Sequence, residues 1–193
     1  FYFGLGDGRS YNLYAPFSDY VYPFSDLSVT GLTGPLVSAW ASLYNVVQQS
    51  NNVIIGISGS PVTADKKNQY IAEARFMRGT AYWYLASLWG DVIISTDPNE
   101  LVKNPIVNKN PTKDVYEFAI RDLEFAAKYL PSQASQSGRL TKYSAYGMLS
   151  RVYLSYAGLS DNPNSGTRDQ KYLDLAKKAA EKVINEGPYL LMK

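Results

Sequence analysis

The stretch at residues 72–92, "AEARFMRGTAYWYLASLWGDV", constrains the fold of this chain more than any other part of the sequence. Across residues 71–89, apolar side chains cover nearly the whole circumference of a helix. A helix that is apolar all round needs neighbours on several sides to bury it. The sequence therefore predicts a central helix that ends at Gly90, where glycine fits the left-handed conformation that closes a helix.

Three charged residues, Glu73, Arg75 and Arg78, interrupt this apolar helix. One interpretation is a catalytic or anion-binding site, and the other is a network of structural ion pairs that locks the helices together. The second is favoured because the chain has no histidine, no phosphate-binding glycine loop and no second carboxylate at a fixed offset. A buried charge without a partner is costly, so we expect all three to be paired, with Arg139 or Arg151 as the partner of Glu73.

Four further helices are predicted from apolar residues that recur at intervals of three and four. They follow Gly34-Pro35, Thr112, Thr141 and Asp169, and they end at "GISGSP", Pro131, Gly158 and Gly187-Pro188. Asp65, Thr112 and Thr141 are the predicted N-caps, because their side-chain oxygens can accept from the first backbone N–H groups of a helix. The residues expected to be buried on the last helix are Leu173, Ala176, Ala180, Val183 and Ile184.

The predicted fold is mostly α: a tetratricopeptide-like scaffold of helical pairs over residues 36–193, with aromatic-rich irregular loops. Trp40 and Trp89 follow the core periodicity of their helices. The loops differ too much in length for a strict repeat, and "VIISTDP" is a possible strand or extended turn before a polar linker. Residues 1–35 show no helical periodicity, so we expect an irregular, aromatic-rich loop region there.

The composition excludes several classes of function. The net charge is only +2 and the basic residues are dispersed, which argues against nucleic acid as a partner. The chain has no cysteine and no histidine, which excludes disulfides, thiolate sites and imidazole chemistry. No cofactor or metal is expected, and the "DNPNSG" loop lacks the alternate spacing of a calcium loop. The longest apolar run, residues 53–57, is too short to span a membrane.

Four stretches of the chain occur in a specific order. They are "AWASLYNVVQQSNNVI", the central "AEARFMRGTAYWYLASLWGDV", "GRLTKYSAYGMLSRVYLSYAG" and "LAKKAAEKVINEGPYLL", which together run from residue 39 to residue 191. In this order they resemble the sequence pattern of the SusD/RagB family. Two departures are Ile93, where the family usually has proline, and Gly79, where alanine is common and glycine costs about 1 kcal/mol in a helix interior.

The resemblance implies a surface-exposed outer-membrane lipoprotein that binds glycans without cleaving them. Such proteins form a lid on a SusC-like, TonB-dependent transporter and deliver nutrients to it. Some relatives take peptides, which is the alternative for this chain. The resemblance also implies an amino-terminal part truncated at both ends, so that the lipid anchor lies outside this chain. A helical glycosidase with two carboxylates is the enzymatic alternative, but no such pair stands out.

The resemblance places the ligand in loops, where aromatic faces stack on sugar rings and polar side chains bind hydroxyl groups. Residues 1–35 contain that mixture of side chains. The predicted ligand-binding residues are Asp7, Arg9, Tyr11, Tyr14, Asp19, Tyr20 and Tyr22. The other interpretation is that these aromatic residues only pack the loops onto the helices.

Overall fold

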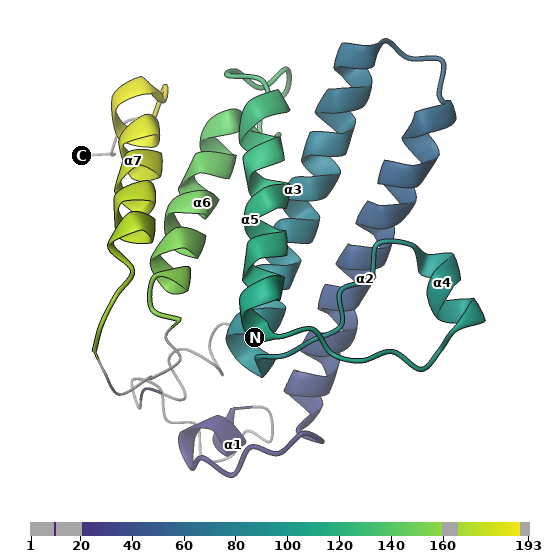
Figure 1. The fold of residues 1–193 in the computed structure, drawn as a ribbon, viewed down its shortest axis with the longest axis vertical. Helices are drawn as coiled ribbons and strands as arrows, with labels where there is room; N and C mark the ends of the chain where they lie inside the picture. Colours follow the sequence, from purple (N-terminus) through teal and green to yellow (C-terminus); the bar gives the residue numbers. More distant parts are fainter. Residues whose placement is uncertain (1–9, 11–20, 160–165, 190–193) are drawn as a thin grey trace. The chain divides into compact units, whose positions relative to one another are not determined.

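The computed structural model describes residues 10, 21–159 and 166–189, and the chain forms two compact units, residues 1–45 and residues 46–193 (Figure 1). Helix α2 (Gly34–Gly56) begins in the first unit and ends in the second. The described residues are mostly helical and include no strand, which confirms the predicted fold class.

The first unit contains α1 (Tyr22–Ser25) and the beginning of α2. The sequence did not predict α1, because a single turn is too short to show helical periodicity. Pro23 lies in its first turn, where the N–H that proline lacks has no partner to lose. Trp40 of α2 packs against Tyr44 with 4.9 Å between ring centroids, but Trp40 is half-buried and not the core residue that the sequence predicted.

The second unit is a row of antiparallel helices, which are α3 (Ala64–Trp89), α5 (Thr112–Tyr129), α6 (Lys142–Tyr156) and α7 (Gln170–Glu186). Each helix packs against the next along the chain, and Figure 1 shows that consecutive helices run in opposite directions. The short helices η2 (Ile57–Gly59) and α4 (Pro98–Lys103) lie in the connections. Antiparallel pairs of this kind agree with a tetratricopeptide-like scaffold.

Helix α3 is the central helix that the sequence predicted. It contacts α5 and α6, it is hydrogen-bonded to α2, and its buried residues include Tyr82 and Leu85. Gly90 follows it with a φ of 72°, a conformation that glycine adopts without strain. Two details differ from the prediction, since Met77 is 46% exposed and Trp89 is only half-buried.

The helix starts show which cap signals in the sequence are sufficient. Thr141 caps α6 as predicted, in a capping box where Thr141 Oγ1 accepts from Ser144 N and Ser144 Oγ accepts from Thr141 N. The prediction for Asp65 is wrong, because Thr63 occupies the N-cap position of α3 and Asp65 lies in the first turn. An acidic residue in the first turn still interacts favourably with the helix dipole, so the two positions look alike in sequence.

The connection between α3 and α5 folds back on itself. Asp91 Oδ1 accepts from the backbone N of Thr112 (2.8 Å) and from its hydroxyl (2.7 Å). The predicted N-cap Thr112 is therefore wrong, because this residue is the first of α5 and acts as a donor. Val92 pairs with Asn110 in an isolated β-bridge, which is what forms from the possible strand. The sequence also missed α4, although Asp97 followed by a proline is a typical helix start and Asp97 does cap this helix.

The buried faces of α5 and α6 match the prediction, and that of α7 does not. The predicted residues that are buried on α5 and α6 are Val115, Ala119, Leu123, Ala126, Ala127, Leu130, Ala145, Leu149, Val152, Tyr153 and Tyr156. On α7 only Ala176 and Ala179 are buried, and Ile184, predicted to be buried, is 73% exposed. Among the described helices, α7 packs against α6 alone. One neighbouring helix covers fewer residues of α7 than the apolar pattern of its sequence predicts to be buried.

Gly79 sets how closely α3 approaches α5. A Cβ atom at this position would lie 3.0 Å from the carbonyl oxygen of Ala119, 3.1 Å from Cβ of Asp122 and 3.1 Å from Cγ of Leu123. Helix backbone and packed side chains cannot move away freely, because protein interiors are close-packed. Close packing of the two helices therefore requires glycine here, despite its low helix propensity.

We expect Gly79→Ala to destabilise the complete protein by up to about 2 kcal/mol, because overpacking costs about 1–3 kcal/mol and outweighs a helix-propensity gain of about 1 kcal/mol. The matched control is Gly147→Ala on α6, where an added Cβ meets nothing within 4 Å. This control should stabilise the protein by about 1 kcal/mol. Chemical unfolding measures both changes, and effects of the same sign and size would contradict a packing role for Gly79.

The capping box of α6 gives a second test. Thr141→Ala should lower the free energy of unfolding by about 1 kcal/mol, because it removes an N-cap oxygen. Thr63→Ala is the matched control, since Thr63 occupies the N-cap position of α3 without a side-chain cap hydrogen bond. Thermal unfolding should show a clear decrease for the first variant and a smaller one for the second. A larger decrease for Thr63→Ala would contradict this assignment of the caps.

Candidate functional site

The structure describes only part of the predicted ligand-binding set. Asp7, Arg9, Tyr11, Tyr14, Asp19 and Tyr20 lie outside the described residues. Tyr22 is the first residue of α1 and is 39% exposed, so its side chain is accessible for contact with a ligand. The ligand-binding role of this loop set therefore remains a prediction. Two other groups of residues lie within the described part of the chain.

The first group is the charged cluster of α3, at whose centre Arg78 binds Asp122 of α5. Arg78 donates from Nε to Asp122 Oδ2 (2.7 Å) and from Nη2 to Asp122 Oδ1 (2.9 Å). Its remaining terminal nitrogen, Nη1, donates to Asn51 Oδ1 of α2 (2.7 Å). The guanidinium also lies over the ring of Phe118, 4.9 Å from the centroid. One arginine thus joins three helices of the second unit.

Asn51 extends this network to the connection after α3. Asn51 Nδ2 donates to the carbonyl oxygen of Ser95 (2.9 Å). The hydroxyl of Tyr82 accepts from Ser95 N (2.7 Å) and donates to Ser95 O (3.1 Å). The backbone of a loop is therefore held by two side chains from two helices, which satisfies polar groups that burial would otherwise leave without partners.

Glu73 and Arg75, the two other charged residues of the cluster, lie at the edge of this network. Arg75 stacks on the ring of Phe125, 4.2 Å from its centroid, and its Nε lies 3.8 Å from Asp122 Oδ1. Glu73 Oε2 accepts from Arg139 Nη2 at 2.7 Å, and Arg139 lies in the connection between α5 and α6. Arg151, the other arginine considered for Glu73, instead lies over the ring of Trp83.

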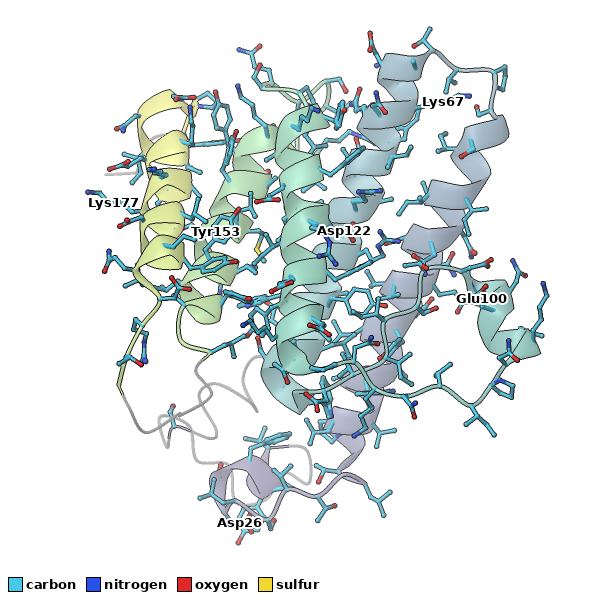
Figure 2. All side chains as sticks on the ribbon, in the orientation of Figure 1. Asp26, Lys67, Glu100, Asp122, Tyr153 and Lys177 are labelled. Atoms are coloured by element: carbon cyan, nitrogen blue, oxygen red, sulfur yellow. The ribbon has the colours of Figure 1, made fainter. Side chains whose placement is uncertain are left out.

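This arrangement has the chemistry of a structural network. Burial raises the pKa of the Asp122 carboxyl, and the hydrogen bonds from Arg78 oppose that shift. Arg78 is 5% exposed and Asp122 is 2% exposed, so neither offers a surface to a ligand. Figure 2 shows Asp122 on α5, within the row of helices. A buried pair of this kind gains little net stability over apolar residues, but removing one partner leaves the other charge uncompensated. The cluster fixes how the helices pack.

The second group lines a groove on α5, α6 and α7, which we call the α5–α7 groove. It consists of two hollows of about 400 Å³ and 380 Å³ that share Glu124, Tyr153 and Leu175. The wall on α5 is made by Glu117, Ile120, Arg121, Glu124, Ala127 and Lys128. The wall on α7 is made by Lys171, Tyr172, Leu175, Lys178, Ala179 and Lys182. The floor comes from α6, with Tyr146, Leu149 and Tyr153.

Two tyrosines of α6 hold the carboxylates of α5 in place along this groove. The hydroxyl of Tyr153 donates to Glu124 Oε1 (2.6 Å), and that of Tyr156 donates to Glu117 Oε1 (2.7 Å). Burial, followed by the neighbouring glutamate, raises the pKa of each tyrosine, so both remain protonated donors. The ring of Tyr172 on α7 packs against them, with its centroid 4.3 Å from that of Tyr156 and 6.1 Å from that of Tyr153.

The sequence did not reveal this groove. Periodicity correctly assigned Tyr153 and Tyr156 to the buried face of α6, but their hydroxyls bond to residues 29 and 39 positions away. Pairs at such separations are set by how the helices pack. A usable signal existed on α7, where lysines 171, 178 and 182 recur at helical spacing on one face.

Two further properties limit the chemistry of the described residues. They include no group of three or more acidic, histidine or cysteine residues that would hold a metal ion. No helix among them combines the length and the apolar character needed to cross a bilayer. What the described part defines is an antiparallel helical scaffold with a buried ion-pair network and a polar, aromatic groove.

Comparison with known proteins assigns this scaffold to a family. A family model described as "Starch-binding associating with outer membrane" matches residues 27–154. A SusD-like protein from Bacteroides ovatus is 38% identical over 192 residues, which are 97% of this chain and 34% of that protein. The chain therefore belongs to the SusD-like family, and it spans about a third of the length of this relative.

Solved structures agree with this assignment. A crystal structure with xylogluco-oligosaccharide is 38% identical, has a TM-score of 0.87 and matches 97% of this chain and 37% of its own. A SusD superfamily protein from Parabacteroides distasonis is 26% identical with a TM-score of 0.77, over 88% of this chain and 36% of its own. The helical scaffold is thus shared well beyond close sequence similarity.

The sequence stretches that resemble the family pattern meet one another in the structure. Asn51 lies near the end of the first stretch and bonds to Arg78 of the second. Glu73 of the second stretch bonds to Arg139 of the third. Asp91, in the "GDV" that ends the second stretch, bonds to Thr112, the first residue of α5, which lies outside the four stretches. These hydrogen bonds join segments that lie far apart in the sequence.

The buried pair gives a test of this structural role. Asp122→Ala should destabilise the complete protein by about 3–5 kcal/mol, because it leaves the Arg78 guanidinium buried without its carboxylate. Asp174→Ala, on the exposed surface of α7, should change stability by less than about 0.5 kcal/mol. Chemical unfolding measures both. The double variant Arg78→Met with Asp122→Leu should recover most of the lost stability. If Asp122→Ala does not destabilise the protein, the ion pair is not needed for the packing of the helices.

Proposed function

We propose that this chain is part of a non-catalytic glycan-binding lipoprotein of the cell surface, which captures oligosaccharides and delivers them to a SusC-like, TonB-dependent transporter in the outer membrane. The observation that carries the proposal is the 38% identity, over nearly the whole chain, to a protein whose crystal structure contains xylogluco-oligosaccharide. The description of the matching family, which names starch binding and the outer membrane, supports the same function.

The proposed ligand site is the aromatic-rich segment before α2. Tyrosine rings there would stack on the apolar faces of sugar rings, while Asp7, Arg9 and Asp19 would bind hydroxyl groups. Tyr22, which is 39% exposed, is the described member of this set. Binding by stacking and hydrogen bonds requires no group that activates a nucleophile, which supports capture without cleavage.

The test is calorimetric titration of the complete protein with xylogluco-oligosaccharide. The double variant Tyr20→Ala with Tyr22→Ala should weaken binding at least about tenfold, which corresponds to about 1.4 kcal/mol. Tyr70→Ala, on half-buried Tyr70 of α3, is the matched control and should leave the affinity unchanged. Release of reducing sugar would contradict the proposal, and so would binding of peptide mixtures that no oligosaccharide displaces.

Delivery to a transporter needs a separate measurement. Affinity purification of the complete protein from solubilised outer membranes should recover a TonB-dependent barrel in equal amount. Recovery of the protein alone, under conditions where the barrel stays folded, would contradict this half of the proposal and leave glycan binding to be judged by the titration.

A further inference from the structure

The α5–α7 groove is long enough to hold several units of an extended ligand. Its lining residues recur at helical spacing from position 117 to 128 on α5 and from 171 to 182 on α7. A span of that length covers about three turns, or about 16 Å along the helix axes. Each of its two hollows, about 400 Å³ and 380 Å³, falls within the range of about 300–1,000 Å³ that is usual for ligand sites.

The walls of the groove differ in charge. Lys171, Lys178 and Lys182 make the α7 wall basic, and all three are exposed. Lys182 donates to Glu186 at 2.6 Å, which raises the pKa of its ammonium group and leaves Lys171 and Lys178 as the stronger sources of positive field. Cationic side chains outnumber carboxylates in the lining of the groove as a whole, and an excess of one sign of charge concentrates ligands of the other sign.

The α5 wall supplies a different set of contacts. Glu117 and Glu124 each accept a tyrosine hydroxyl through one carboxylate oxygen, and a carboxylate can accept several hydrogen bonds. On the same wall, Arg121 lies between the two glutamates in sequence, and Lys128 follows Glu124. This wall is therefore suited to hydroxyl groups, while the α7 wall is suited to anionic groups.

The side chains that line the groove distinguish between two occupants, a partner helix and a glycan. The hollow nearer the start of α5 is lined by only two aliphatic residues, Ile120 and Leu175, so the apolar face of a partner helix would find little to bury there. Tyr172, which is half-buried, lines the same hollow, and tyrosine rings accept the apolar faces of sugars. The groove thus combines a tyrosine ring, glutamates that can accept hydrogen bonds from hydroxyl groups, and lysines that attract anions. This combination matches a glycan that carries carboxylate groups of its own.

We propose that the α5–α7 groove is a second glycan site, which binds oligosaccharides containing uronic acids. Their carboxylates would lie against Lys171 and Lys178 of α7, and their hydroxyls against Glu117 and Glu124 of α5. The proposal rests on the proposed function only in taking the ligand to be a glycan, because none of its residues belongs to the segment before α2.

The experiment titrates the complete protein with tetragalacturonate and, separately, with xylogluco-oligosaccharide. Lys171→Gln combined with Lys178→Gln should weaken tetragalacturonate binding at least tenfold and leave xylogluco-oligosaccharide binding unchanged. The matched control is Lys177→Gln, adjacent in sequence but on the side of α7 away from Tyr153, with its side chain 76% exposed (Figure 2). This control should bind both ligands as the unchanged protein does.

Salt and the tyrosine variants separate the two proposals. Raising the ionic strength should weaken tetragalacturonate binding strongly, because exposed charges are screened, and should affect the neutral ligand little. Tyr20→Ala with Tyr22→Ala should weaken the neutral ligand alone. If the unchanged protein binds tetragalacturonate but not xylogluco-oligosaccharide, that result would contradict the proposed function and not the groove.

Three results would overturn the groove proposal. One is no binding of tetragalacturonate by a folded protein that still binds xylogluco-oligosaccharide. Another is tetragalacturonate binding that the lysine variant does not weaken while circular dichroism shows the variant folded. The third is lysine-dependent binding of a glutamate-rich helical peptide without any binding of tetragalacturonate, which would make the groove a protein-docking site.

Discussion

The bidentate bond between Arg78 and Asp122 is the interaction on which the rest of the scaffold depends. It places two opposite charges, both almost fully buried, between α3 and α5, and the third guanidinium nitrogen binds Asn51 of α2. A charge in such a position is tolerated only when its partner is present and well oriented. The registers of three helices are therefore coupled, since a shift of any one would leave a charged or polar group buried without a partner.

Gly79 and the ion pair act together. Because Gly79 follows Arg78 directly and lies against Asp122 Cβ, the absence of a side chain brings the α5 backbone close enough for the short hydrogen bonds of the pair. From α5 the row continues through the tyrosine–glutamate bonds to α6 and by apolar packing to α7. The buried ion pair lies between α3 and α5, while the α7 end of the row exposes polar side chains along the groove.

Sequence patterns predicted the elements well and their environments unevenly. The stripes of α5 and α6 were correct because both helices have neighbours on two sides, so every apolar position that periodicity selects is covered. On α7 the same reasoning failed for Ile184, since one neighbour cannot cover the whole face. The caps divide in the same way: Thr141 bonds within its own turn and was predictable, whereas Thr112 bonds to Asp91 across a connection. Of the candidate site, composition indicated the loop set, while the lysines that recur on one face of α7 were an unused signal for the groove.

What the sequence alone determined is the fold class, the family pattern and the need for partners at Glu73, Arg75 and Arg78. These follow from local periodicity and from the cost of burying charge, and both are properties of a segment by itself. Only the tertiary structure decided which partners they have, why glycine stands at position 79, and that lysines of α7 face glutamates of α5 across the tyrosines of α6. The physical reason is distance along the chain: contacts between residues dozens of positions apart depend on how helices pack, and no local pattern encodes that geometry.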